Sequence, residues 1–155
     1  MEEDLRKKCL SRLQKLCSKA EYCEADIYRK ALKAMEGDSE AAAAIVASLV
    51  EERYVDDARY ASAYAREKAG IQGWGPIKIR FQLRAKGVKD AVISRALEEV
   101  EPEKASDKLD RLMATKAKSL QGDPQERLKL LKFGLSRGYS YDDVEASLAR
   151  IKNNC

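Results

Sequence analysis

The sequence contains no histidine, and its four cysteines form no CxxC pair. Without histidine, a Ser–His–Asp triad, a Cys–His pair and a histidine acid or base are all excluded. The ligand spacing of the usual zinc sites is also missing. We therefore expect no enzyme activity, no cofactor and no metal. Cys9 and Cys17 lie on a helical pattern, so we expect them to be buried as small apolar groups rather than joined in a disulfide.

Glycine is scarce as well, and its only cluster, at residues 70–75, reads GIQGWG. This cluster does not lead to Gly-Lys-Ser/Thr, which excludes a phosphate-binding loop of that type. The carboxylate pairs Asp56-Asp57 and Asp142-Asp143 stand where helices are expected to start. Carboxylates there cap unpaired N–H groups, and we favour this role over metal binding in a nuclease. DNA cleavage that depends on Asp56 would favour the nuclease instead.

Long hydrophobic runs are missing, since the longest mainly apolar run spans residues 41–50 and is interrupted by Ser48. That is half of the length that a bilayer crossing needs, so we interpret it as a buried helix. The acidic start, MEED, is unlike the basic start of a signal peptide. We expect no membrane contact and a cytoplasmic location. The 45% hydrophobic residues suffice for a core, and the 36% charged residues indicate a large solvated surface.

Residues 54–100 predict three helices separated by two turns. Asp56 is placed to cap the first helix, which we expect to run to about residue 69. Pro76 can begin the second helix, because proline lacks only an N–H group that would be unpaired there. Lys86-Gly87-Val88 ends the second helix, since the glycine can take the left-handed conformation of a C-cap.

This pattern repeats along the chain. Moving forward by 51 residues places Lys86-Gly87-Val88 on Arg137-Gly138-Tyr139, and moving back by 48 residues places Ile93 on Ile45. No alternating run of strand length interrupts the pattern. The sequence therefore predicts an all-α fold of three tandem three-helix repeats, stacked along one axis into an elongated molecule. The expected repeats are residues 1–53, 54–101 and 102–155.

The outer repeats divide in the same way. Glu101-Pro102-Glu103 is expected to break the chain between the second and third repeats, and Ser140 with Asp143 has the spacing of a capping box. The helices expected in the first repeat cover residues 3–20, 24–35 and 39–53, and those in the third cover residues 106–120, 125–135 and 140–151.

Charge is distributed unevenly. The net charge is only +4, but residues 70–89 and 127–138 contain no acidic residue. Both stretches include the second helix of a repeat, so stacking is expected to align their basic residues into a surface suited to phosphates or to an acidic protein groove. A solvated basic face that binds nothing is the alternative. The candidate residues are Lys78, Arg80, Arg84, Lys86, Lys129, Lys132 and Arg137.

Aromatic residues are few, and Trp74 is the only tryptophan. We favour a role in which Trp74 anchors its loop onto a helix over a role as an exposed contact. For Tyr139 and Tyr141 the sequence does not decide between a buried anchor and an exposed contact.

Several of these segments together resemble the RecX family of bacterial regulatory proteins. They are YVDDARYA at 54–61, Gly75-Pro76 with the apolar residues that follow, KGV at 86–88 and LSRGYS at 135–140. The resemblance covers about residues 22–151. It is weakest in the first repeat, where Gly37-Asp38-Ser39 replaces a Lys-Gly-aromatic turn.

The resemblance implies a non-enzymatic modulator of the RecA recombinase, usually inhibitory, that acts in DNA repair and recombination. It also implies an elongated, curved molecule that lies in the groove of the RecA filament. The RecA filament is then the expected partner, single-stranded DNA is contacted weakly or indirectly, and a monomer is expected. The family has no motif-defined catalytic residues to carry over. The prediction that the seven basic residues form a binding surface therefore rests on the charge pattern alone.

A helix-turn-helix protein that binds duplex DNA is the main alternative, because it also places a turn before its last helix. Its recognition helices would be residues 89–100 and 140–151. Both carry several acidic residues, which is unfavourable in the major groove. Sequence-selective duplex binding that survives about 200 mM salt would favour this alternative.

Overall fold

The structure is a computed structural model that describes residues 2–153, and within them it contains helices and no strand. The prediction of an all-α fold is confirmed. No helix in this range is long and apolar enough to cross a membrane. The helices are α1 (Glu2–Lys19), α2 (Glu24–Ala34), α3 (Ser39–Glu51), α4 (Asp57–Gly70), α5 (Pro76–Ala85), α6 (Asp90–Glu98), α7 (Pro102–Ser119), α8 (Glu126–Ser136) and α9 (Tyr141–Asn153).

These helices form two compact units. The first unit contains the residues up to Ala63 together with Leu83–Ile93, and the second contains Tyr64–Gln82 together with the residues from Ser94 onward. The boundaries between the units fall inside α4, α5 and α6. The division into repeats at residues 1–53, 54–101 and 102–155 stays a prediction from the sequence pattern.

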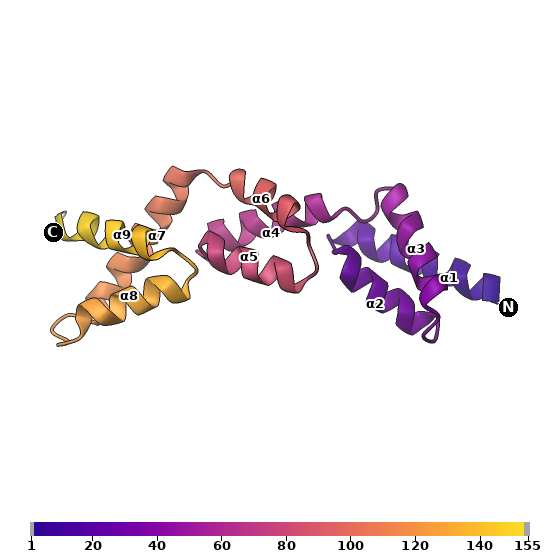
Figure 1. Ribbon diagram of the computed structural model, residues 1–155, viewed down its shortest axis with the longest axis horizontal. Helices are drawn as coiled ribbons and strands as arrows, with labels where there is room; N and C mark the ends of the chain where they lie inside the picture. Colours follow the sequence, from indigo (N-terminus) through magenta and orange to yellow (C-terminus); the bar gives the residue numbers. More distant parts are fainter. Residues whose placement is uncertain (1, 154–155) are drawn as a thin grey trace. The chain divides into compact units, whose positions relative to one another are not determined.

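The core of the first unit lies among α1, α2 and α3, which pack against one another (Figure 1). Alanines let α3 approach closely, and Ala41 and Ala42 are fully buried. Cys9, Cys17 and Cys23 are buried free thiols, as expected for the first two, and burial raises the pKa of each. Cys155 lies outside the described residues.

The turn after α5 packs onto the start of α2 in the first unit. The Cys23 Sγ donates to the Lys86 carbonyl oxygen at 3.6 Å, and the Lys86 Nζ lies 3.2 Å from a carboxylate oxygen of Asp26. Gly87 has the predicted left-handed conformation, with φ +82°, and a Cβ there would lie 3.3 Å from Ala25. We call residues 86–88 the first docking turn.

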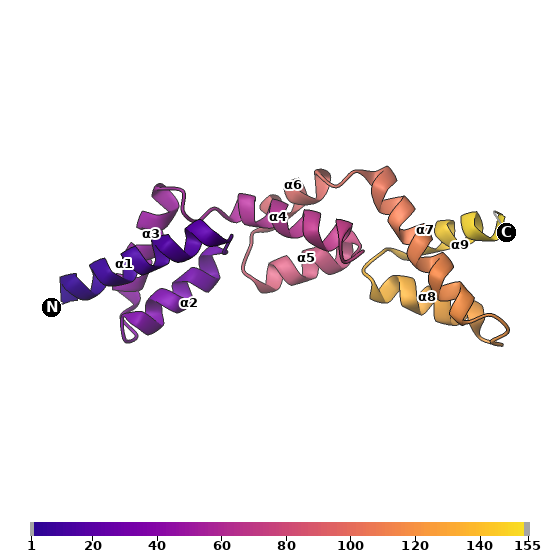
Figure 2. The same cartoon turned by 180° about the vertical axis from the view of Figure 1, so that it is seen from behind.

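The core of the second unit lies among α7, α8 and α9, which Figure 2 shows packed together. Tyr139 and Val144 have the spacing of a hydrophobic staple at the start of α9, and both are buried in this core. The other buried members are Leu109, Met113, Leu130 and Leu148.

The turn before α9 packs onto the start of α5 in a matching way. The Gly75 N–H donates to the Arg137 carbonyl at 2.7 Å, and the Ile77 N–H donates to the Gly138 carbonyl at 2.9 Å. The Tyr139 hydroxyl donates to the Gly73 carbonyl at 3.2 Å. Residues 137–139 form the second docking turn. The two segments that the 51-residue repeat had matched therefore make the same kind of contact, each on the start of a second helix.

One predicted boundary is wrong. The sequence predicts a break at Glu101-Pro102-Glu103 and a helix from Ser106, whereas α7 already begins at Pro102. Pro102 lies in the first turn of the helix, where a backbone N–H would have no acceptor within the helix, so its absence costs no hydrogen bond. The fixed φ of proline also suits the helix. The apparent breaker is therefore the helix start.

Asp56 caps α4 as predicted, whereas at the start of α9 the Ser140 hydroxyl accepts the Asp143 N–H. An Asp56 carboxylate oxygen accepts the backbone N–H groups of Ala58 at 2.9 Å and Arg59 at 3.2 Å. Asp57 has a different role, because its carboxylate accepts the Glu24 N–H at 2.8 Å and so ties the start of α4 to the start of α2. Neither carboxylate needs a metal to explain its position.

We expect Asp56→Ala to lower the free energy of unfolding by about 1 kcal/mol, since two N–H groups of the first turn of α4 lose their acceptor. Asp56→Asn keeps an acceptor oxygen and is expected to lose only a few tenths of that amount. Urea unfolding followed by circular dichroism measures both changes. Equal stability of the alanine variant and the parent chain would contradict the capping role.

Candidate partner-binding surface

The helix α5 places apolar side chains on two opposite sides. Ile79 is buried, with 1% of its surface exposed, whereas Ile77 and Phe81 are 56% and 69% exposed. Ile77 and Phe81 are four residues apart, so they lie on one face of the helix. Large apolar side chains exposed together are unusual in a chain that otherwise buries its apolar residues well.

The helix α8 repeats this arrangement in part, since Lys132 stands at the position that corresponds to Phe81. Leu130 is buried, while Leu128 and Leu135 are 47% and 44% exposed. Leu128 stands 51 residues after Ile77, the interval of the sequence repeat. Among the described residues, eight large apolar side chains are exposed, and four of them belong to α5 and α8. We call Ile77 with Phe81 the α5 patch and Leu128 with Leu135 the α8 patch.

Three of the seven predicted basic residues are paired with carboxylates. The separations are 2.6 Å for Arg84 with Asp90, 3.2 Å for Lys86 with Asp26, and 2.6 Å for Lys129 with Asp123. The hydrogen bond that Arg84 donates to Asp90, together with the negative charge of Asp90, raises the pKa of Arg84. Hydrogen bonds from Lys129 and a backbone N–H lower the pKa of Asp123. Much of the charge at these three positions is therefore neutralised within the chain.

Three further basic residues each contact at least one group that carries no charge. The Lys78 Nζ lies 4.3 Å from the centre of the Trp74 ring, and the Arg80 guanidinium donates to the Ser94 hydroxyl at 3.0 Å. The Arg137 guanidinium donates to the Gln72 carbonyl. It thereby helps to hold the second docking turn.

Lys132 is the seventh predicted residue, and it is exposed on α8. It forms no ion pair within residues 2–153, so its charge is available to a partner. Arg84 and Lys86 belong to the first unit, and the other five predicted residues belong to the second. A single basic surface made of all seven stays a prediction.

Trp74 anchors its loop, which is the role that the sequence favoured. Its ring packs edge-on against Tyr64, with 6.3 Å between the ring centres. Lys68 and Lys78 place their ammonium groups 4.9 and 4.3 Å from the centre of the same ring. Of the two tyrosines left open, Tyr139 is a buried anchor and Tyr141 is 56% exposed.

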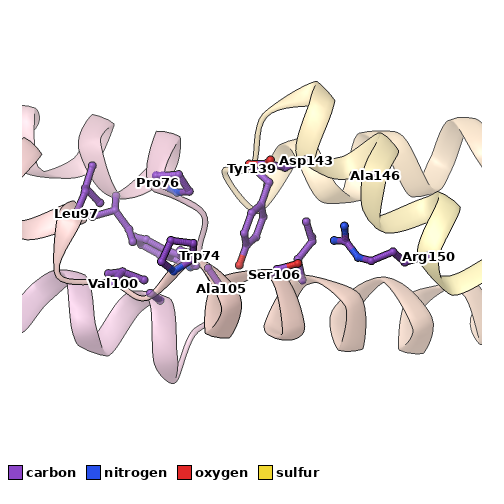
Figure 3. Close-up of a pocket in the computed structure, with 14 residues that line it drawn as sticks. Trp74, Pro76, Leu97, Val100, Ala105, Ser106, Tyr139, Asp143, Ala146 and Arg150 are labelled. Carbon is purple, nitrogen blue, oxygen red and sulfur yellow. The ribbon is translucent and has the colours of Figure 1, made fainter.

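A cavity of about 300 Å³ lies in the second unit, between the loop that carries Trp74 and the helices α5, α6, α7 and α9 (Figure 3). Most of its lining is apolar. The Tyr139 hydroxyl and the Arg150 guanidinium are already bonded, to Gly73 and to Asp110. The other polar lining groups are the side chains of Ser106 and Asp143 and the indole N–H of Trp74. The cavity therefore offers little that would orient a ligand. Within the described residues no cluster of acidic or cysteine side chains is suited to hold a metal ion.

Sequence reasoning missed the two apolar patches because it searched for charge. A signal was present in α5, where apolar residues stand at 77, 79, 81 and 83. A helix turns by 100° per residue, so residues at this spacing cannot all reach one core. Two of the four had to face solvent.

The sequence and the fold were compared with known proteins. The family model described as the second three-helix domain of RecX matches residues 56–97. "Regulatory protein RecX" from Bacillus mycoides (strain KBAB4) is 34% identical over 111 residues, and that from Bacillus thuringiensis (strain Al Hakam) is 33% identical over the same length. Each alignment covers 70% of this chain and 41% of the relative. The matched part of the chain therefore spans about two fifths of the length of these relatives.

Two solved structures share the fold. A crystal structure of regulatory protein RecX superposes with a TM-score of 0.84 and 27% identity, over 93% of this chain and 71% of that one. RecX from Lactobacillus salivarius gives a TM-score of 0.83 over 97% and 98% of the two chains, and at 20% identity it shows the fold alone. The matched domain, the sequence relatives and the first of these structures agree, and the chain belongs to the RecX family of regulatory proteins.

Proposed function

We propose that this protein binds the RecA filament on single-stranded DNA and slows its ATP hydrolysis and strand exchange. The observation that carries the proposal is the pair of docking turns, residues 86–88 and 137–139, which make matching contacts 51 residues apart. Contacts that recur at a fixed interval along the sequence are typical of a protein built from repeats. A protein built in this way suits a partner that is itself a regular polymer. Each weak contact then adds to the avidity of the others.

The charges of the second unit support this partner. Lys132 is exposed and has no ion pair within the described chain, and the contacts of Lys78 and Arg137 do not neutralise them. These three residues are the strongest members of the proposed basic surface. Arg84, Lys86 and Lys129 already hold carboxylates, so they are expected to contribute less. Such a surface attracts an acidic groove and speeds association with it.

The test is the single-strand-dependent ATP hydrolysis of RecA from the same source, measured with increasing amounts of the full chain. Suppression well below one copy per RecA protomer is the expected result. No suppression at stoichiometric excess, together with no binding to the filament, would contradict the proposed function. A selection for duplex DNA sequences would then test the helix-turn-helix alternative.

Within that assay we expect Lys132→Glu to raise the concentration needed for half-maximal suppression about fivefold, because a rim charge meets an acidic partner with the wrong sign. Lys118→Glu makes the same change of charge at another exposed position of the second unit, on α7, and serves as the matched control. An equal effect of the two variants would show that only net charge matters. Lys132 would then be removed from the contact surface.

A further inference from the structure

We propose that a groove between α7 and α8 binds a single-stranded nucleic acid chain directly, with three cations for the phosphates and an aromatic ring for a base. The groove lies within the second unit and has a volume of about 370 Å³ (Figure 2). The inference goes beyond the proposed function, because it concerns nucleic acid alone and requires no RecA. The lining residues that carry it are Lys108, Arg111, Thr115, Lys116 and Phe133.

The groove carries positive charge that the chain leaves unpaired. Lys108, Arg111 and Lys116 line it, and none of the three forms an ion pair within residues 2–153. Its lining, as far as the structure describes the chain, includes no acidic residue. On the same helix, Asp107 forms no ion pair with Arg111 in the described range, and Asp110 is bonded to side chains of α9. The three charges are therefore available to a negatively charged partner.

The spacing of these cations suits a phosphodiester chain. Lys108 and Lys116 are eight residues apart on α7, so they span about 12 Å along the helix axis, with Arg111 between them. A stacked strand advances about 3.4 Å per nucleotide, so about three nucleotides, each with one phosphate, fit this length. Thr115 is exposed in the same stretch, and its hydroxyl can donate to a phosphate oxygen. A peptide carries negative charge only at its acidic residues and matches this density of cations less well.

Phe133 on α8 supplies the aromatic ring. Its side chain packs against the core of the second unit and also lines the groove, and the Lys116 Nζ lies 5.6 Å from the centre of its ring. An aromatic side chain beside unpaired cations is the combination that single-strand-binding proteins use, because the ring stacks on a base while the cations contact phosphates. The bases of a duplex are stacked on one another and cannot reach such a ring. A single strand is therefore the expected ligand.

The test measures binding of the full chain to a fluorescently labelled oligothymidylate by fluorescence anisotropy, in a salt series and without RecA. Three phosphate contacts predict a slope of about −2 for the logarithm of affinity against the logarithm of salt concentration. We expect Arg111→Ala to weaken binding about 5- to 10-fold at about 50 mM salt and to make this slope shallower by about 0.7.

Two further variants complete the test. Phe133→Leu keeps an apolar side chain against the core and is expected to weaken binding about 5-fold with an unchanged slope, because it removes stacking and no charge. Lys152→Ala is the matched control, since it removes an exposed cation of the same unit on α9, outside the groove. It is expected to bind like the parent chain. Circular dichroism checks that each variant remains helical.

An Arg111→Ala variant that binds like the Lys152→Ala control would overturn the inference. Equal affinity for a duplex of the same length would also overturn it. Displacement of the oligothymidylate by polyglutamate at the same concentration of charge would overturn it in favour of an acidic protein segment. Suppression of RecA ATP hydrolysis by a chain that does not bind the oligothymidylate would overturn this inference alone. Arg111-dependent binding of the oligothymidylate without that suppression would support this inference and contradict the proposed function alone.

Discussion

Gly75→Ala is expected to lower the free energy of unfolding by about 3 kcal/mol and the melting temperature by about 10 °C. A Cβ at this position would lie 2.3 Å from the Gly138 carbonyl oxygen and 2.6 Å from the Tyr139 nitrogen. Both atoms belong to the backbone of the second docking turn. The turn would have to move away, which would break the hydrogen bonds that Gly75 and Ile77 donate to it.

Gly70→Ala provides the matched control for this prediction. Gly70 ends α4, and a Cβ there would have no atom within 4 Å. We expect this variant to be as stable as the parent or more stable by up to about 1 kcal/mol, because alanine restricts the unfolded chain. Thermal unfolding and urea unfolding measure both variants. If Gly75→Ala unfolds like Gly70→Ala, the contact between the docking turn and α5 does not hold the second unit together.

Asp110→Ala is expected to lower the free energy of unfolding by about 2–3 kcal/mol. The Asp110 carboxylate accepts the Ser147 hydroxyl at 2.6 Å and two guanidinium N–H groups of Arg150 at 2.9 and 3.0 Å. Ser147 is fully buried, so the alanine variant leaves its hydroxyl without an acceptor in the core. Asp107→Ala, at an exposed position on the same helix, is the matched control and is expected to change stability by less than about 0.5 kcal/mol.

The same carboxylate makes stability depend on pH. Burial raises the pKa of Asp110, but the hydrogen bonds from Arg150 and Ser147 outweigh it and leave the pKa below its ordinary value. Because the pKa of Asp110 is lowered in the folded state, the contribution of this carboxylate to the free energy of unfolding is fully present above the unfolded-state pKa of about 4. It is lost as the pH falls below about 4, through the folded-state pKa. Urea unfolding at pH 7 and pH 3 is therefore expected to show a smaller loss of stability with acid in Asp110→Ala than in Asp107→Ala. An equal loss would contradict the role of this carboxylate.

Local signals made most of the fold predictable from the sequence. Gly87 and Gly138 require a left-handed backbone at the turns, and Asp56 supplies a cap, so the helix boundaries around them follow from neighbouring residues. The start of α7 was mispredicted because proline can either interrupt a helix or occupy its first position. The path of the chain before Pro102 decides which of the two occurs. The repeat was visible because both docking turns carry a basic residue before glycine.

The partners of the basic residues were not predictable in the same way. Lys86 meets Asp26, 60 residues earlier in the chain, and no local pattern links the two. The sequence analysis counted residues 70–89 as an acid-free stretch, but acids from elsewhere in the chain reach it. Charge counted along a sequence therefore overestimates the charge that a folded surface presents. The apolar patches, in contrast, followed from helical geometry and were overlooked.

The first docking turn has a consequence for biosynthesis. The first unit consists of the residues up to Ala63 and of Leu83–Ile93, and the segment between them belongs to the second unit. A nascent chain therefore cannot complete its first unit when α3 leaves the ribosome. Cys23 and Asp26 at the start of α2 cannot form their contacts with Lys86 until that residue, about 60 positions later, has been synthesised. Folding is thus tied to chain elongation, and an interrupted translation product leaves the start of α2 uncovered.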